Sequence, residues 1–461
     1  MLTSRLDELA GILDAELCGP GDRTVAGGCT DSRRVGAGEV YFALPGERFD
    51  GHAFVTAAFE AGAGAAVVAR ERRAEIGAAG PLLWVDDPLK ALAAWAAAHR
   101  RQSAVRVIGV TGSLGKTTTK DLLAAVLSRR YRVLANVASF NAEIGLPLTL
   151  LRLTAEHEVA VLEMAMRGAG QIRALAEIAA PEIGLITNIG VSHMELLGSQ
   201  AAIAAAKAEL IEALPPEGTA ILPADDPFLP FLRERAPEAV TFGLSATADA
   251  RVEPLPPGDG GARLRLHAPR WLAEPLEIEL PLPGRHNALN AAAAALGGLL
   301  LGLSAEEIAA GLASAAVSPM RMQIHRRADG VVILDDAYNA SSPAAMRAAL
   351  ETLAEERRGR RAIAVLGDML ELGELSPAAH REVGEVVAAL PPDLLVTVGP
   401  RAAEIGAVAR EAGLEAVIVC ETVEAGLRAL ESRIQAGDLI LVKGSRGMAM
   451  ERLVQGLLAC S

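Results

Sequence analysis

The sequence has few of the residues that disulfide-bonded, zinc-binding or nucleic-acid-binding proteins use most. Its four cysteines show no CxxC spacing, which disfavours a disulfide framework or a zinc site and fits a reducing cytoplasm. The net charge is −13, whereas nucleic-acid binding usually requires a basic surface. We therefore expect no nucleic-acid partner, and an anionic substrate would have to be held by local cations.

Aromatic residues and long apolar runs are also scarce. Aromatic side chains make up 3% of a chain that is 51% hydrophobic, so we expect cores of Ala, Leu, Val and Ile. The most apolar run, Ala288 to Leu303, contains Asn290 and is short for a membrane span, which predicts a buried helix and no membrane insertion. The first residues carry Arg5, Asp7 and Glu8 and no apolar signal core, so we expect a cytoplasmic protein.

The stretch from Val105 to Lys120, VRVIGVTGSLGKTTTK, predicts a strand, a glycine loop and a helix. This is the context of a phosphate loop, where backbone N–H groups and a helix N-terminus surround the phosphates. Lys116 would reach the β- and γ-phosphates, and the Thr117 hydroxyl would bind Mg²⁺. Val110 replaces the first glycine of the usual pattern, so an ordinary turn with a surface lysine is the alternative. The loop predicts nucleotide binding but no particular reaction.

Polar residues follow two predicted strands in the middle of the chain. Glu163 comes after the run Val159 to Leu162, and the residues up to His193 come after the strand Ile183 to Ile186. In open α/β folds, ligands bind at this edge of the sheet. Glu163 and His193 are therefore candidate Mg²⁺ ligands, His193 the weaker because Mg²⁺ prefers oxygen. A structural histidine is the alternative.

Two predicted helices carry further candidate side chains. Lys207 lies on the helix Ile203 to Leu214, and its residues alone favour a lysine that faces solvent. Asn287 and Asn290 lie three residues apart at the start of the Ala-rich helix and so share a face. Amides provide the donor and acceptor that adenine needs, and helix capping by Asn287 is the alternative.

The order of the predicted elements indicates an α/β protein of three domains, residues 1–100, 101–316 and 317–461. The second domain contains the phosphate loop and a small β insertion at 241–283. In the third, strands and helices alternate, which predicts a doubly wound sheet. In the first, the TDSR stretch, Thr30 to Arg33, suits a loop that grips a phosphate or nucleoside, although a solvated loop is favoured by the residues alone.

Taken together, these motifs resemble the Mur ligases, the ATP-dependent amide-forming enzymes of peptidoglycan assembly. The resemblance spans essentially all 461 residues and rests on TGSLGKT at 111–117, Glu163, the stretch 188–193, Lys207 and HNALN at 286–290. Longer stretches, GDMLELGELSPAAH at 367–380 and KGSRGMAMERLV at 443–454, are similar to the member that adds D-alanyl-D-alanine to UDP-N-acetylmuramoyl-tripeptide. Leu114, Ala142 and the late Pro343 depart from the family pattern.

The resemblance implies three domains: a small α/β uridine-nucleotide domain, a central P-loop domain and a C-terminal Rossmann-like domain. It implies ATP contacts from the loop residues Thr111, Gly112, Ser113, Leu114, Gly115, Lys116, Thr117 and Thr118. Asn287 and Asn290 should contact the nucleotide base region. Arg321 should reach phosphate and Asp336 the ribose, with Asp335 as the alternative.

The family resemblance also implies the catalytic and metal-binding residues. The catalytic set is Lys116, Glu163, His193 and Lys207. Mg²⁺ should be held by Thr117, Glu163 and His193, and by Lys207 as a carbamate. The UDP-linked substrate should contact Thr30, Asp31, Ser32, Arg33 and Asn141.

The implied reaction forms an acyl phosphate on the UDP-linked tripeptide, which D-alanyl-D-alanine then attacks. We expect a monomer whose third domain closes over ATP. Another Mur-type ligase, a folylpolyglutamate-type ligase and a P-loop ATPase without ligase activity are the alternatives.

Overall fold

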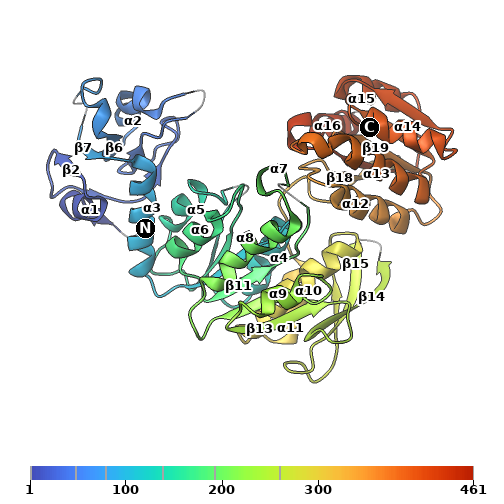
Figure 1. Cartoon of the computed structure of the whole chain (residues 1–461), viewed down its shortest axis with the longest axis horizontal. Helices are drawn as coiled ribbons and strands as arrows, with labels where there is room; N and C mark the ends of the chain where they lie inside the picture. Colours follow the sequence, from blue (N-terminus) through green and yellow to red (C-terminus); the bar gives the residue numbers. More distant parts are fainter. Residues whose placement is uncertain are drawn as a thin grey trace.

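The computed structural model describes residues 3–46, 49–77, 80–137, 140–191, 194–258 and 261–459. Three α/β units follow one another along the chain in this part of the sequence (Figure 1). The first unit (blue) and the third (orange to red) stand on either side of the central unit in this view. None of the described helices is both long and apolar enough to cross a membrane.

The first unit is a five-stranded sheet in the order β2-β7-β6-β5-β4, parallel except at β2. Its strands are β2 Glu16–Cys18, β4 Gly28–Cys29, β5 Val40–Phe42, β6 Ala65–Ala69 and β7 Leu82–Val85, and a separate pair is β1 Ser4–Arg5 with β3 Thr24–Val25. Its helices are α1 Leu6–Leu13, η1 Gly51–Phe54, α2 Val55–Glu60, η2 Arg70–Arg72 and α3 Pro88–Arg101.

Helix α3 joins the first unit to the second. The Asp87 carboxylate accepts the N–H groups of Leu89 and Lys90, and Pro88 occupies the first turn, so the sequence fixes where the helix begins. Its buried Trp95 stacks on Phe42 of the first sheet, with ring centroids 6.0 Å apart. Trp95 belongs to one apolar core that continues into the central unit. The first two units therefore share a core.

The central unit is a nine-stranded sheet in the order β16-β15-β14-β13-β12-β11-β8-β10-β9. Its strands are β8 Arg106–Thr111, β9 Val133–Ala135, β10 Val159–Glu163, β11 Ile183–Ile186, β12 Thr219–Pro223, β13 Glu238–Gly243, β14 Ala250–Gly258, β15 Gly261–His267 and β16 Leu276–Glu279. Strands β8 to β14 run parallel, and β15 and β16 are antiparallel to their neighbours. The predicted β insertion is present, but its strands extend this sheet and do not form a sheet of their own.

Helices cover both faces of the central sheet. One face carries α5 Gly145–Leu150, α6 Gln171–Ala179 and α8 Gln200–Glu212, together with α3. The other carries α4 Lys116–Leu127, α10 Arg285–Leu300 and α11 Ala305–Ala313. Two short helices are α7 Met194–Leu197 and α9 Leu229–Arg233.

The third unit is a six-stranded sheet in the order β17-β18-β22-β19-β20-β21, in which β17 alone is antiparallel among the described strands. The strands are β17 Gln323–Arg326, β18 Val332–Asp336, β19 Ala362–Gly367, β20 Leu394–Val398, β21 Val417–Cys420 and β22 Leu439–Lys443. One face packs α12 Pro343–Glu356, α13 Ser376–Ala389 and α14 Ala403–Glu411, and the other packs α15 Val423–Glu431 and α16 Glu451–Ala459. Two short 3₁₀ helices are η3 Gly373–Leu375 and η4 Arg446–Met448. The predicted doubly wound sheet is confirmed.

The third unit has its own apolar cores on the two faces of its sheet and touches the central unit lightly. The linker 314–322 connects them, and α12 lies against the start of α10. A Cβ on Gly284, whose φ is +96°, would lie 2.3 Å from Thr352 Oγ1 of α12, so glycine permits this close approach. Arg358 also donates to the Gly258 carbonyl across 2.7 Å. The predicted boundaries after residues 100 and 316 stay predictions.

Trp95 offers a test of the shared core. Trp95→Ala should lower the free energy of unfolding of the first two units by about 3–5 kcal/mol, because a buried indole is replaced by a cavity. Urea unfolding followed by circular dichroism measures this loss. Val419→Ala is the control, since Val419 is 41% exposed and its truncation should change stability by less than about 0.5 kcal/mol. Equal effects of the two substitutions would contradict a core at Trp95.

Candidate active site

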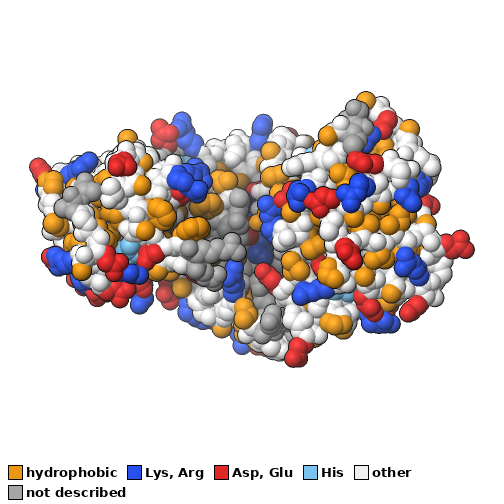
Figure 2. All heavy atoms as spheres, turned by 90° about the horizontal axis from the view of Figure 1, so that it is seen from above, with side chains coloured by type: hydrophobic (Ala, Val, Ile, Leu, Met, Phe, Trp, Pro, Cys, Tyr) orange, Lys and Arg blue, Asp and Glu red, His pale blue; other side chains and the backbone are white. Residues whose placement is uncertain are grey.

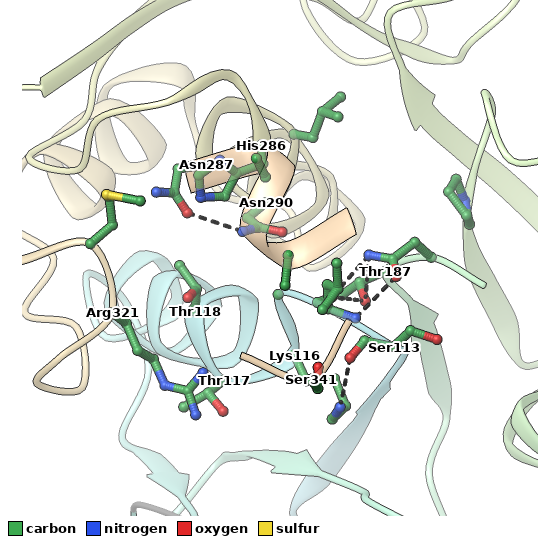
Figure 3. A pocket seen from close by; sticks show the side chains of 18 of the residues that line it. Ser113, Lys116, Thr117, Thr118, Thr187, His286, Asn287, Asn290, Arg321 and Ser341 are labelled. Atoms are coloured by element: carbon green, nitrogen blue, oxygen red, sulfur yellow. Dashed lines mark hydrogen bonds between the residues drawn. The ribbon is translucent and has the colours of Figure 1, made fainter. Parts of the chain in front are cut away.

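A cavity of about 500 Å³ lies between the central and third units. The phosphate loop, the start of α10 and residues of the third unit line it, and Figure 3 shows its side chains. Seen from above, a hollow separates the first unit at the left from the third at the right, with basic side chains at its edge (Figure 2). The predicted strand, loop and helix of the phosphate loop are confirmed as β8, 112–115 and α4.

The backbone of the phosphate loop requires glycine at two positions. Gly112 has a φ of +147°, and a Cβ there would lie 1.9 Å from Thr187 Oγ1. Gly115 has a φ of +78°, and a Cβ there would lie 2.4 Å from Asn290 Oδ1. Val110, which replaces the first glycine of the usual pattern, lies inside β8 with its side chain buried in the core. The loop therefore keeps the two glycines that its geometry needs.

Residues after β11 hold the loop in place. The Asn188 side chain accepts the Leu114 N–H across 3.0 Å and donates to the Leu114 carbonyl across 2.9 Å. Thr187 donates to the same carbonyl across 2.6 Å. Ser113 Oγ accepts the Gly190 N–H across 2.8 Å. His193, which the sequence places two residues beyond the described Val191, lies outside the described residues.

Two lysines donate to the same backbone carbonyl of the loop, that of Gly112. Lys116 Nζ and Lys207 Nζ each lie 2.9 Å from the Gly112 oxygen. The prediction from the residues alone that Lys207 faces solvent is wrong, since α8 packs that face against β8 and β11 and leaves Lys207 2% exposed. Burial lowers the pKa of Lys207 well below its usual value, and the Lys116 charge lowers this pKa further. Burial also lowers the pKa of Lys116.

Glu163 is the buried carboxylate of the site. It ends β10, and its Oε2 accepts the Thr117 hydroxyl across 2.7 Å. Its Oε1 accepts the Asn141 amide across 2.7 Å. These hydroxyl and carboxylate oxygens are ligands that Mg²⁺ prefers. No group of three or more His, Cys, Asp or Glu side chains that could hold a metal occurs in the described ranges, so Mg²⁺ would depend on these oxygens and on nucleotide phosphates.

The two asparagines of α10 form a relay to α4. Asn290 Nδ2 donates to Asn287 Oδ1 across 3.2 Å, and Asn290 Oδ1 accepts the Thr119 hydroxyl across the same distance. Both amides line the cavity (Figure 3). Helix capping by Asn287 is wrong, because the residue before the first turn is Gly284 and the Asn287 amide donates to the Pro283 carbonyl.

The linker brings Arg321 to the cavity, and β18 of the third unit brings Asp336. Their implied contacts with phosphate and ribose stay predictions. The Arg321 guanidinium lies 4.0 Å above the Tyr338 ring, and Figure 3 shows it beside Thr117. Asp336 accepts from Lys443 Nζ across 2.5 Å. Asp335 does not line the cavity, and its carboxylate faces His325 instead. Neither spacing nor periodicity pointed to this Asp336–Lys443 pair.

A second pocket of about 420 Å³ lies between the first and central units. Thr30 and Asp31 line it, together with Arg34 and Arg152. The lining does not include Ser32 and Arg33. Arg33 instead pairs with Asp31 across 2.8 Å, which lowers the pKa of Asp31 to about 2.

Most of the remaining predicted residues line the main cavity. Asn141 lines the cavity of the phosphate loop, where it holds Glu163, and does not line the second pocket. Ser113, Leu114, Gly115 and Thr118 line the main cavity, whereas Thr111 ends β8 and donates to the Met164 carbonyl.

His286 faces the third unit across the cavity and provides a pH test. Burial lowers its pKa to about 4, and the Lys443 charge adds to this although Asp336 opposes it. Between pH 6.5 and 4 the unfolded chain binds a proton here and the folded chain does not, so stability falls as the pH falls. His286→Gln should reduce the stability lost between pH 7.5 and 5 by roughly 1–2 kcal/mol, measured by urea unfolding. An equal loss in both proteins would contradict this assignment.

Comparison with known proteins gives the family. Residues 24–100 match the Mur ligase family catalytic domain, 110–297 the Mur ligase middle domain, and 320–446 the Mur ligase glutamate ligase domain. The UDP-N-acetylmuramoyl-tripeptide–D-alanyl-D-alanine ligase of Bacillus subtilis is 38% identical, and that of Escherichia coli 36%, each over 99% of both chains. These are ligases of the kind that the sequence resembles.

Solved structures agree with this relationship. A crystal structure of MurF from Acinetobacter baumannii matches with a TM-score of 0.89 and 33% identity over 100% of this chain and 99% of that one. MurF from Thermotoga maritima, solved in complex with ADP, matches with a TM-score of 0.82 and 29% identity over 94% and 97% of the two chains. A folylpolyglutamate synthase from Mycobacterium tuberculosis, 20% identical with a TM-score of 0.64, shares the fold alone. The chain belongs to the Mur ligase family.

Proposed function

We propose that this protein uses ATP to join D-alanyl-D-alanine to UDP-N-acetylmuramoyl-tripeptide, releasing ADP and phosphate in cytoplasmic peptidoglycan precursor synthesis. The observation that carries the proposal is the sequence identity of 36–38%, over 99% of the chain, to two UDP-N-acetylmuramoyl-tripeptide–D-alanyl-D-alanine ligases. The cavity adds chemical support, because a phosphate-loop lysine, a buried carboxylate and an arginine of the linker meet there. One chain supplies all these residues, so a monomer suffices.

The first step must bring together two anions, the tripeptide carboxylate and the γ-phosphate. A carboxylate oxygen attacks the γ-phosphorus, the bond to the β–γ bridging oxygen breaks, and ADP leaves an acyl phosphate behind. Lys116 would neutralise the phosphoryl group, and Arg321, which lines the same cavity, would add a second cation. In the second step the neutral amine of D-alanyl-D-alanine attacks the acyl carbon and loses a proton, and phosphate leaves.

Thr117 and Glu163 would hold Mg²⁺, with His193 as the third candidate. When bound, this ion neutralises charge on the transferring phosphoryl group. A hydrogen bond from the Thr117 hydroxyl to the Glu163 carboxylate holds these two oxygens 2.7 Å apart. Asn141 orients the Glu163 carboxylate through its other oxygen.

Lys207 is proposed to carry a carbamate that helps to hold a second Mg²⁺. Carbamoylation requires a neutral amine, and the lowered pKa of Lys207 favours that form. The neutral amine joins CO₂ and loses one proton, so a neutral group becomes an anion. The resulting anion would also attract the Lys116 ammonium, which approaches the same Gly112 carbonyl.

The pocket of Thr30 and Asp31 is proposed to hold the uridine-nucleotide part of the substrate. Arg34 and Arg152 supply the local cations that an acidic protein needs for a diphosphate. The third unit is proposed to close over ATP, because its light contact with the central unit costs little to rearrange. Closure would exclude the water that hydrolyses an acyl phosphate.

Phosphate release from MgATP tests the function, with the two substrates added singly and together. We expect release only when UDP-linked tripeptide and D-alanyl-D-alanine are both present, with a pentapeptide product by mass. Lys116→Ala should reduce kcat at least about a hundredfold, because an electrostatic partner of the transferring group is lost. Lys90→Ala, a change to a side chain that is 86% exposed, is the matched control. Release with neither substrate would favour an ATPase, and release with glutamate a folylpolyglutamate-type ligase.

Carbamoylation of Lys207 is tested by incubating the protein with ¹³C-labelled CO₂. We expect a carbamate carbon signal in the NMR spectrum that disappears in Lys207→Arg, because a guanidinium keeps its charge and forms no carbamate. Activity should fall when dissolved CO₂ is removed and return when it is restored. A fully active enzyme with an unmodified Lys207 would sink this proposal.

A further inference from the structure

The second turn of α4 contains a buried ion pair that lies outside both pockets. Lys120 Nζ and Asp121 Oδ1 are 2.6 Å apart, and the two side chains are 3% and 12% exposed. Neither residue lines the ATP cavity or the pocket of Thr30 and Asp31. Because a buried ion pair is seldom more stable than apolar residues of the same volume, its presence calls for another reason.

Asp121 is attached to the linker between the central and third units. Its second oxygen, Oδ2, accepts the backbone N–H of Ser318 across 2.8 Å, although the two residues are 197 positions apart. Ser318 lies in the linker 314–322, three residues before Arg321. The carboxylate thus fixes the chain just before the point where Arg321 enters the cavity.

Lys120 is connected through Asn136 to Glu163, which lines the same cavity. The Lys120 ammonium donates to the backbone carbonyl of Asn136 across 2.7 Å. The Asn136 side chain then accepts the Glu163 N–H across 2.9 Å and donates to the Glu163 carbonyl across 3.1 Å. Asn136 and Glu163 are both 1% exposed, so these bonds are shielded from water. The position of Glu163 therefore depends on Asn136, and that of Asn136 on Lys120.

We propose that Lys120 and Asp121 are a pair of positioning residues that couples the linker of the third unit to Glu163. A continuous set of short polar contacts runs from Ser318 through this pair and Asn136 to Glu163, and Thr117 closes it at the phosphate loop. Nucleotide and Mg²⁺ at Glu163 would then tighten the linker, and a displaced linker would weaken the metal site. The inference rests on the proposed function only in that the cavity takes Mg²⁺ and nucleotide.

The test uses Asp121→Asn in the full chain, with Mg²⁺ and ADP as the probes. An amide has one oxygen in place of two, so it keeps at most one of the two contacts. We expect the Mg²⁺ concentration at half-maximal ADP binding, measured by calorimetry, to rise by roughly tenfold, the low end for partners that orient metal ligands. In the unchanged protein we expect Mg²⁺ and ADP to protect residues 314–322 from hydrogen exchange. In Asp121→Asn we expect this protection to be lost.

The chain offers a matched control in Asp393→Asn. Asp393 pairs with Arg357 across 2.6 Å and accepts the Ala362 N–H across 2.7 Å, which is the same chemistry inside the third unit alone. This substitution should leave both readouts unchanged. Lys120→Met, which removes the cation and keeps the apolar stem, is the second variant and should reproduce both effects of Asp121→Asn.

Three outcomes separate the possible failures. Unchanged readouts in Asp121→Asn, or equal changes in Asp393→Asn, would overturn the coupling while leaving the ligase function intact. Equal changes in Asp121→Asn and Asp393→Asn would mean that a general loss of stability, and not the linker contact, alters Mg²⁺ dependence and hydrogen exchange. Failure of the unchanged protein to bind ADP with Mg²⁺ would instead overturn the proposed function.

Discussion

Two lysine ammonium groups that share one backbone oxygen set the electrostatics of this site. Lys116 and Lys207 approach the Gly112 carbonyl from different helices, each at 2.9 Å. Two cations at one carbonyl in a buried site repel each other more strongly than they would in water. The arrangement is stable if one amine is neutral or becomes an anion. Burial and the Lys116 charge both lower the pKa of Lys207, which favours its neutral form. A carbamate at Lys207 would leave Lys116 as the cation available to a phosphoryl group.

The rest of the architecture builds the cavity from the central unit and the third unit. The loop is rigid because Asn188 and Thr187 hold Leu114, and because Gly112 and Gly115 allow no larger side chain. The first two units share a core through α3, so the pocket of Thr30 and Asp31 and the phosphate loop keep a fixed relation. The third unit has its own cores, separate from the core that the first two units share. Its linker is nevertheless bonded to α4 of the central unit, through the Ser318 N–H and the Asp121 carboxylate.

Sequence patterns predicted the features that depend on local order. Runs of β-forming residues, and the glycine and polar residues that end them, predict three features. These are the phosphate loop, the position of Glu163 at a strand end, and the doubly wound third sheet. Lys207 was misjudged because α8 is apolar nearly all round, so its periodicity cannot tell which face is buried. Strand β17 was missed because Gln323 to Arg326 contains one apolar residue and pairs only through β18.

Contacts between distant segments could not be predicted from the chain order. Lys120 and Asp121 are neighbours on a helix, yet their partners are 16 and 197 residues away. The family resemblance assigned Asn141 to the UDP-linked substrate, but its amide donates to Glu163 and does not line the second pocket. Asp335 and Asp336 look equivalent in sequence, and only the alternation of β18 sends one to His325 and the other to the cavity.

The most direct measurement for this account is the fate of the substrate carboxylate oxygen. UDP-linked tripeptide labelled with ¹⁸O in its C-terminal carboxylate should be converted with ATP and D-alanyl-D-alanine, and the released phosphate analysed by mass. Attack of the carboxylate on the γ-phosphorus predicts one ¹⁸O atom in each phosphate. Phosphate that contains no ¹⁸O would show that water, and not the substrate, received the phosphoryl group, and would contradict the account.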